Sequence, residues 1–214
     1  MRKRDCRVVV FAKAPVPGEV KTRLVPSIDA RTAAVLYEEM VSHALRTAVA
    51  AAAGPVDLWC APSAEHPFFV RCSKEFKIKL RAQTEGDLGG RMAQAFSETL
   101  KISTCALLIG SDCPCLTQSD LREAASFLQH GVDAVIGPAE DGGYVLLGLS
   151  QSTPELFKGV PWGTASVLEE TRTRLQSLGW RWHELPERWD VDRPEDLERL
   201  MDEGYFDAIL RPLL

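Results

Sequence analysis

The sequence predicts an α/β fold in which a mostly parallel central sheet carries helices on both faces. Short apolar runs alternate along the chain with longer segments whose apolar residues recur at helical spacing. Glycines and charged residues gather directly after several of the apolar runs. Strands that alternate with helices form parallel sheets, and these sheets bind ligands near the carboxyl ends of their strands. We therefore expect the functional residues just after the strands.

The first predicted elements follow from local composition. The apolar run RVVVF at residues 7–11 is typical of a buried strand. Residues 30–53 are alanine-rich with apolar positions at helical spacing, and Gly54-Pro55 ends this predicted helix. VDLWCA at 56–61 and the alternating FKIKL at 76–80 predict two further strands.

The same reasoning covers the rest of the chain, where Gly131 and Gly179 each follow a helical pattern as C-terminal stop signals. The elements expected there are a helix at 91–100, a strand at 105–110, a helix at 120–130, strands at 133–137 and 144–149, a helix at 164–178, a strand at 180–185 and a helix at 194–202.

Composition limits the class of protein. The chain has 214 residues, 45% of them hydrophobic and 26% charged, as in an ordinary globular protein, and we expect one domain over residues 1–214. Its net charge of −5 argues against non-specific binding to nucleic acid. No stretch approaches the ~18 apolar residues of a membrane span, and the N-terminal apolar run is shorter than that of a signal peptide. We expect a cytoplasmic protein.

Six cysteines fit a reduced compartment better than a disulfide scaffold. Cys113 and Cys115 flank Pro114, which is too tight a spacing for a routine disulfide, and no second pair follows at zinc-site spacing. The sequence thus favours small buried residues here over metal binding or redox chemistry.

The loop FAKAPVPGEVKTRL, residues 11–24, gathers three cations after the first predicted strand. It matches neither the P-loop nor the dinucleotide-binding glycine pattern. Two prolines stiffen the turn and Gly18 permits close backbone approach, so Lys13, Lys21 and Arg23 could direct positive charge at a polyphosphate. The alternative is a solvated surface turn.

A second candidate segment is GDLGGRM, residues 86–92. Its glycines directly precede a predicted helix, where backbone N–H groups can meet a ligand. The alternative is an ordinary turn in which Asp87 caps the helix.

Acidic residues follow other predicted strands. Asp112 comes after the most apolar run and is not needed as a cap, so it is a candidate Mg²⁺ ligand. Glu140 and Asp141, beside paired glycines, make the loop between two predicted strands unusually acidic for a hairpin. Asp190 and Asp192 precede the last predicted helix, although Asp192 could simply cap it.

These motifs together carry a resemblance. In order, FAKAPVPGEVKTRL, GDLGGRM, IGSDCP, GPAEDGGYVLLGL, PWGT and DVDRPEDL resemble a bacterial family of nucleotide-diphospho-sugar transferases, some associated with arsenosugar biosynthesis or radical-SAM gene neighbourhoods. The family is similar to the 2-phospholactate and molybdenum-cofactor guanylyltransferases. The resemblance covers residues 7 to about 200 and implies a single-domain, Rossmann-like GT-A fold, without fixing the substrate.

The resemblance also implies roles for residues. Asp112 and Asp192 would bind Mg²⁺ or Mn²⁺, with the part played by Asp190 left open, and Lys21, Arg23 and Asp112 would be catalytic. Gly110 stands where sugar-transferring members of the fold usually have the first acid of an Asp-x-Asp motif, which favours nucleotidyl transfer. The implied nucleotide-binding residues are Lys13, Gly18, Lys21, Arg23, Gly86, Asp87, Gly89, Gly90 and Arg91. The implied acceptor-binding residues are Glu140, Asp141, Gly142, Gly143, Tyr144, Trp162 and Thr164.

Three functions remain open from the sequence. The favoured one is nucleotidyl transfer from an NTP to a small phosphorylated or hydroxylated acceptor, because the basic loop suits a triphosphate. The second is glycosyl transfer from an NDP-sugar. The third is a nucleotide-binding module without catalysis. The expected partners are thus a nucleotide and a small-molecule acceptor, with no nucleic acid.

Overall fold

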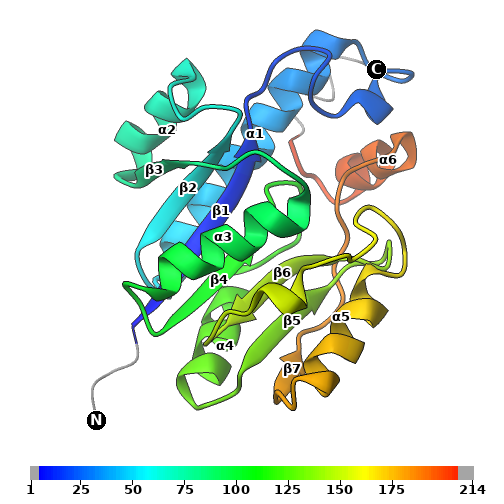
Figure 1. The fold of residues 1–214 in the computed structure, drawn as a ribbon. Coiled ribbons are helices and arrows are strands. Elements are labelled where there is room, and N and C mark those ends of the chain that lie inside the picture. Colours follow the sequence, from blue (N-terminus) through cyan, green and yellow to red (C-terminus); the bar gives the residue numbers. More distant parts are fainter. Residues whose placement is uncertain (1–4, 207–214) are drawn as a thin grey trace.

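The computed structural model describes residues 5–206. Its centre is a seven-stranded sheet in the order β3-β2-β1-β4-β6-β5-β7 (Figure 1). Neighbouring strands are parallel except where β6 pairs antiparallel with β4 and β5. The predicted mostly parallel sheet is therefore confirmed. The strands are β1 Cys6–Lys13, β2 Val56–Ala61, β3 Lys79–Ala82, β4 Cys105–Ile109, β5 Ala134–Pro138, β6 Tyr144–Leu149 and β7 Trp182–Glu184.

Helices cover both faces of this sheet, as the alternating pattern predicts. Apolar residues of α1, α2 and α4 form one core with the sheet, and those of α3 and α5 form another on the opposite face. In Figure 1, α3 crosses in front of the sheet and α1 lies behind it. Within residues 5–206, no helix has the length and apolar character needed to cross a bilayer. The α-helices are α1 Ala30–Ala51, α2 Pro67–Phe76, α3 Leu88–Leu100, α4 Gln118–Gln129, α5 Val167–Ser177 and α6 Pro194–Asp202, and 3₁₀ turns lie at η1 Thr22–Leu24 and η2 Pro154–Leu156.

Helix α2 corrects the sequence prediction, which placed a strand at 76–80. Pro67 occupies the first turn of the helix, and the backbone N–H of Phe68 donates to the His66 ring (3.3 Å). Lys77 then adopts a left-handed conformation (φ 54°) that ends the helix, so the strand begins only at Lys79. The alternating apolar pattern straddles this boundary and does not reveal it.

The antiparallel strand β6 shapes the edge of the sheet at which β1 and β4 end. Its first residues lie beside the last residues of β4, since Ile109 pairs with Leu146 and Gly110 N–H donates to the Val145 carbonyl (3.2 Å). The β5–β6 turn, residues 139–143, thereby reaches the edge at which β1 and β4 end. The segment before α6 joins the same edge, because Val191 N–H donates to the Asp112 carbonyl (2.9 Å).

Candidate active site

Two adjoining cavities open at this edge of the sheet. The first, of about 320 Å³, extends toward the end of β1 and is called the Lys13 cavity. The second, of about 180 Å³, is lined by the loop before α5 and is called the Trp162 cavity. Asp112, Tyr144 and Asp190 line both cavities. Two bound molecules would therefore meet at these side chains.

Asp112 is paired with Lys21 at the junction of the cavities. The Lys21 Nζ donates to Asp112 Oδ2 (2.9 Å) and to the Val191 carbonyl (2.6 Å), and its side chain is only 7% exposed. Burial alone would lower the pKa of the ammonium, but the Asp112 carboxylate outweighs this effect and the pKa is raised. Lys21 is therefore a buried charged group held against Asp112 rather than extended into solvent, and it lines neither cavity itself.

Asp190 is the second carboxylate at the junction. Its pKa is raised to about 7, first by burial and then by the nearby carboxylates of Asp112 and Asp141, against the opposing effect of Lys21. The carboxylates of Asp112 and Asp141 thus act on Asp190 beside one ammonium, so the site has an excess of negative charge that a cation would relieve.

Gly110 leaves room for the Asp112 carboxylate. A Cβ at residue 110 would lie 2.8 Å from Asp112 Oδ1, closer than real Cβ contacts. The absence of a side chain at Gly110 thus allows the Asp112 carboxylate to fold back toward the strand end.

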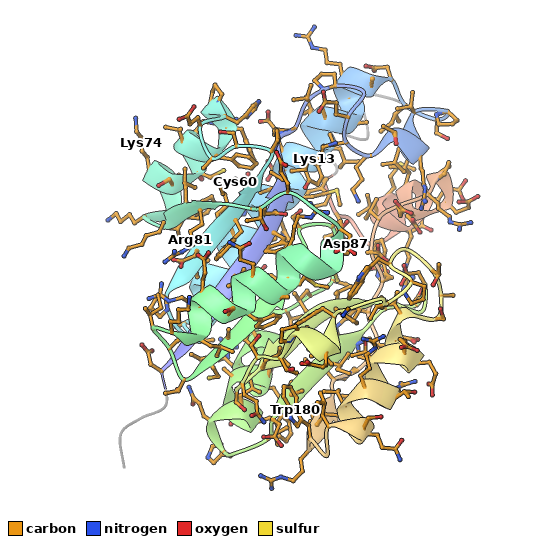
Figure 2. All side chains as sticks on the ribbon, in the orientation of Figure 1. Lys13, Cys60, Lys74, Arg81, Asp87 and Trp180 are labelled. Carbon is orange, nitrogen blue, oxygen red and sulfur yellow. The ribbon has the colours of Figure 1, made fainter. Side chains whose placement is uncertain are left out.

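The Lys13 cavity carries positive charge and amide groups. Lys13, Arg91 and Gln83 line it, and Arg91 Nη1 donates to Gln83 Oε1 (3.2 Å). The Gln83 amide donates to the Ala12 carbonyl (3.3 Å), which ties the end of β3 to the end of β1. Figure 2 labels Lys13 at the end of β1 and Asp87 at the start of α3, on the same side of the molecule.

The Trp162 cavity has a different character. Tyr144 and Trp162 meet edge to face with ring centroids 6.4 Å apart. Asp141 lies at the mouth of the turn, where its Oδ1 accepts from Gly143 N–H (2.8 Å). Among the described residues that line this cavity, which include Thr164, none is Lys or Arg. The cavity therefore combines aromatic surface with acidic groups.

Glycines predicted to bind the nucleotide or the acceptor have structural roles in this protein. A Cβ on Gly89 would lie 2.4 Å from Trp162 Nε1 and 2.8 Å from the Phe157 carbonyl oxygen. Gly89 therefore lets the Trp162 ring approach α3 closely. Gly90 N–H donates to Asp87 Oδ1 (2.7 Å), so Asp87 caps α3, the alternative that the sequence left open. A Cβ on Gly142 would overlap the Ala165 carbonyl oxygen, at 2.2 Å.

Other predicted site residues lie outside both cavities. Arg23 is 66% exposed and pairs with Asp192. Glu140 pairs with Arg199 of α6 (2.8 Å). Gly18 and Gly86 adopt positive φ values of 81° and 116° in turns, and neither lines a cavity.

The structure places Asp190, rather than Asp192, beside Asp112. The chain turns away after Val191 to start α6, and Asp192 N–H donates to Asp196 Oδ2 (2.8 Å). Asp192 therefore belongs to the start of the helix and to the surface pair with Arg23.

The donor set fits a divalent cation that is completed by a ligand. Mg²⁺ prefers oxygen ligands and commonly takes one or two carboxylates together with substrate phosphates and water. Asp112 and Asp190 provide two carboxylates at the junction of the cavities. Within the described range 5–206, no group of three or more His, Cys, Asp or Glu side chains is placed to hold a metal. The residues therefore suit a metal bound together with a phosphorylated substrate, and not one held by protein alone.

Sequence reasoning missed the support behind the site. Tyr37, from α1, lines the Lys13 cavity, and its hydroxyl contacts both Ser111 Oγ (3.0 Å) and Lys13 N–H (3.0 Å). A tyrosine in a predicted helix gives no sign that it reaches a strand end. Gln83 directly follows β3 and could have been found, had the end of that strand been placed correctly.

Comparisons with known proteins agree with this architecture. A protein from Desulfovibrio desulfuricans G20, named as a candidate nucleotide-diphospho-sugar transferase, superposes with a TM-score of 0.85 at 29% identity, covering 97% of this chain and 94% of that one. CMP:2-keto-3-deoxy-manno-octonic acid synthetase, in a complex with CTP, has a TM-score of 0.59 at 13% identity and covers 94% of this chain and 99% of its own.

Glucosyl-3-phosphoglycerate synthase from Mycobacterium tuberculosis, in a complex with Mn²⁺, UDP and glucosyl-3-phosphoglycerate, has a TM-score of 0.58 at 12% identity, covering 97% of this chain and 79% of that one. No curated protein matches the sequence. The structural matches show the GT-A fold of nucleotidyl- and glycosyltransferases. The model of the family described as "uncharacterized protein conserved in bacteria" (DUF2064) matches residues 44–164, more than half of the chain, and the chain therefore belongs to that family.

Proposed function

We propose that this chain is a transferase that uses an activated nucleotide and a small-molecule acceptor, with Mg²⁺ or Mn²⁺ as its cofactor. The observation that carries the proposal is the meeting of two cavities at Asp112 and Asp190, beside the buried ammonium of Lys21. Group transfer requires two adjacent substrates and charge stabilisation where they meet. The named activities of the structural neighbours support this class of reaction.

The charges of the lining side chains favour a different substrate in each cavity. Lys13 and Arg91 can offset the phosphates of a nucleotide in the Lys13 cavity. The acidic Trp162 cavity would repel a second phosphate, so it suits a neutral, hydroxylated acceptor better than a phosphorylated one. Aromatic rings such as Tyr144 and Trp162 offer an apolar surface to such a molecule.

Asp112 and Asp190 would hold the metal, which when bound offsets phosphate charge and polarises the phosphoryl oxygens. The contribution of the chain itself is positioning. Lys21 is fixed by Asp112 and the Val191 carbonyl, so its charge is already in place beside Asp112 before substrates bind.

Of the two transfer reactions, we favour nucleotidyl transfer. The acceptor hydroxyl would attack the α-phosphorus in line, and pyrophosphate would leave toward the basic loop. Lys21 would support this reaction, because its buried ammonium pairs with Asp112, beside which charge would develop on the attacked phosphoryl group.

Glycosyl transfer from an NDP-sugar is the second candidate, and a separate observation favours it. Arg23 lies outside the Lys13 cavity and pairs with Asp192, which leaves Lys13 and Arg91 as the cations that line it. Two cations suit a diphosphate. The Tyr144–Trp162 pair in the neighbouring cavity could then face the donor sugar.

The test is a screen of NTPs and NDP-sugars against hydroxylated and phosphorylated acceptors, with and without Mn²⁺. Metal-dependent release of pyrophosphate would support nucleotidyl transfer, and release of a nucleoside diphosphate would support glycosyl transfer. Nucleotide binding without turnover across the screen would favour the binding module. A protein that binds no nucleotide by calorimetry, with metal present, contradicts the proposal.

A further inference from the structure

Two thiols follow Asp112 and lie close together. Cys113 and Cys115 are free, and their Sγ atoms are 3.6 Å apart. The intervening Pro114 is held in place, since its carbonyl is 3.0 Å from the His43 Nε2. The sequence spacing argues against a disulfide, but the fold already brings the two sulfur atoms into contact.

The two thiols differ in environment. Cys113 is buried at 6% exposure, whereas Cys115 is half-buried and reaches the Trp189 carbonyl, at 3.5 Å. The hydrogen bond with Cys113 and the nearby Arg188 guanidinium both favour the thiolate of Cys115, so its pKa is lowered. This arrangement places an accessible nucleophilic thiol beside a protected one.

A second cysteine pair in the same molecule provides an internal comparison. Cys6 of β1 and Cys105 of β4 face each other in the strand register, but they are 1% and 0% exposed. Cys60 and Cys72 are also buried in the core. Access from solvent therefore separates Cys115 from the other thiols of the described chain.

We propose that Cys113 and Cys115 form a redox-active dithiol that a hydroperoxide converts into a disulfide. The Cys115 thiolate attacks the peroxide oxygen, which leaves a sulfenic acid on Cys115 and releases an alcohol or water. The Cys113 thiol then displaces hydroxide from this sulfur, the S–S bond forms and one water leaves. Two electrons pass from the two thiols to the peroxide, so a reductant such as a dithiol restores the starting state.

Disulfide formation changes the geometry next to the active site. The sulfur atoms must approach from 3.6 Å to about 2 Å. Cys113 is adjacent to Asp112, and Cys115 contacts Trp189, which is adjacent to Asp190. Oxidation would therefore shift the segments that carry both acids and weaken metal-dependent nucleotide binding. This effect on binding rests on the proposed function, whereas formation of the disulfide is independent of it.

Mass spectrometry of the folded full-length chain tests the chemistry. The reduced protein is treated with hydrogen peroxide, alkylated and digested. We expect a loss of two hydrogen atoms that maps to the peptide with Cys113 and Cys115. Cys113→Ser should stop at a sulfenic acid on Cys115, which a dimedone probe traps, and Cys115→Ser should form neither product. The matched control Cys72→Ser should oxidise like the wild type.

An unchanged peptide at residues 113–115, or oxidation that maps first to Cys6 and Cys105, would overturn the proposal. Calorimetry with Mn²⁺ and a nucleotide then measures the effect on the site, where we expect affinity to fall at least fivefold on oxidation and to return with dithiothreitol. If the disulfide forms and affinity is unchanged, the link to the site is refuted. If the reduced protein binds no nucleotide, the proposed function fails. The mass measurement still shows whether Cys113 and Cys115 form a disulfide.

Discussion

Asp57 and Asp112 are both acids paired with cations near the strands of one sheet, yet their surroundings differ. Asp57, in β2, is 1% exposed and lies between Arg7 (3.0 Å) and Arg81 (3.0 Å), and Arg81 also lies 3.8 Å from Glu98. Two carboxylates there face two guanidinium groups, one of them Arg81, which is labelled in Figure 2.

At the candidate active site, the carboxylates of Asp112 and Asp141 both act on Asp190, with Lys21 as the ammonium among them. The balanced cluster joins three neighbouring strands through paired opposite charges. The cluster at the candidate site has more carboxylates than cations, so a bound cation would offset the excess negative charge. Charge balance and exposure together therefore distinguish the structural acid Asp57, 1% exposed, from Asp112, 38% exposed, which is proposed to bind a metal.

The largest expected effect is on stability, from Asp57→Ala. Removing this carboxylate leaves two guanidinium groups without their shared partner, and breaking a buried ion pair costs about 3 kcal/mol or more. Urea unfolding should show this loss, while nucleotide affinity of the folded variant stays near the wild-type value. A loss below about 1 kcal/mol would mean that water replaces the carboxylate at little cost.

Asp112→Asn should have the opposite profile. We expect metal-dependent nucleotide affinity to fall more than tenfold, about 1.4 kcal/mol, because an amide is a poor ligand for Mg²⁺. Stability should change less than in Asp57→Ala, since the amide oxygen can still accept from Lys21. Calorimetry with and without Mn²⁺ measures the difference, and Asp192→Asn is the matched control outside the cavities. Equal affinities for wild type and Asp112→Asn in the presence of metal would exclude Asp112 as a ligand.

The raised pKa of Asp190 predicts a pH effect on the metal-free protein. An ordinary Asp in the unfolded chain has a pKa of about 3.9, whereas Asp190 in the folded chain titrates at about 7. Between these values the folded state binds more protons, so the contribution of Asp190 to stability falls as pH rises from about 4 to about 7 and then levels. We expect a smaller effect than that of Asp112→Asn on binding, because water in the open cavity screens the charges.

Urea unfolding in EDTA, from pH 4.5 to 8, checks this expectation. The stability of Asp190→Asn relative to wild type should increase across that range. Parallel stability curves for the two proteins would show that Asp190 titrates normally.

Arg23→Ala should have the smallest effect on stability. The Arg23–Asp192 pair is exposed, and such pairs contribute less than about 1 kcal/mol. The same variant tests the predicted phosphate contact, which requires Arg23 to leave Asp192 when a nucleotide binds. A larger loss of affinity for an NTP than for an NDP-sugar would support nucleotidyl transfer. Equal losses would favour glycosyl transfer.

The sequence predicted the elements that local patterns define. The apolar run of β4 followed by Asp112, the hairpin of β5 and β6 and the last helix all lie where their residues indicated. The position of β6 between β4 and β5 could not be predicted, because strand order depends on contacts distant along the chain.

The pairing of Lys21 with Asp112 has the same long-range origin, since 91 residues separate the two. Charge in the loop predicted a ligand, but the loop's own fold gives Lys21 a protein partner first. The link to arsenosugar or radical-SAM pathways, the cytoplasmic location and the absence of a nucleic-acid partner stay predictions.

The two hydrogen bonds of Val191 set the order in which the site can be completed during synthesis. Its N–H holds the Asp112 carbonyl and its own carbonyl holds Lys21, so a residue made late fastens two that were made much earlier. Chains emerge from the ribosome with the N-terminal end first. A nascent chain that has already formed β1, β4 and the basic loop can pair Lys21 with Asp112, but it still lacks both hydrogen bonds of Val191. We therefore expect nucleotide binding to begin only once the segment before α6 has emerged, so incomplete chains should bind no nucleotide.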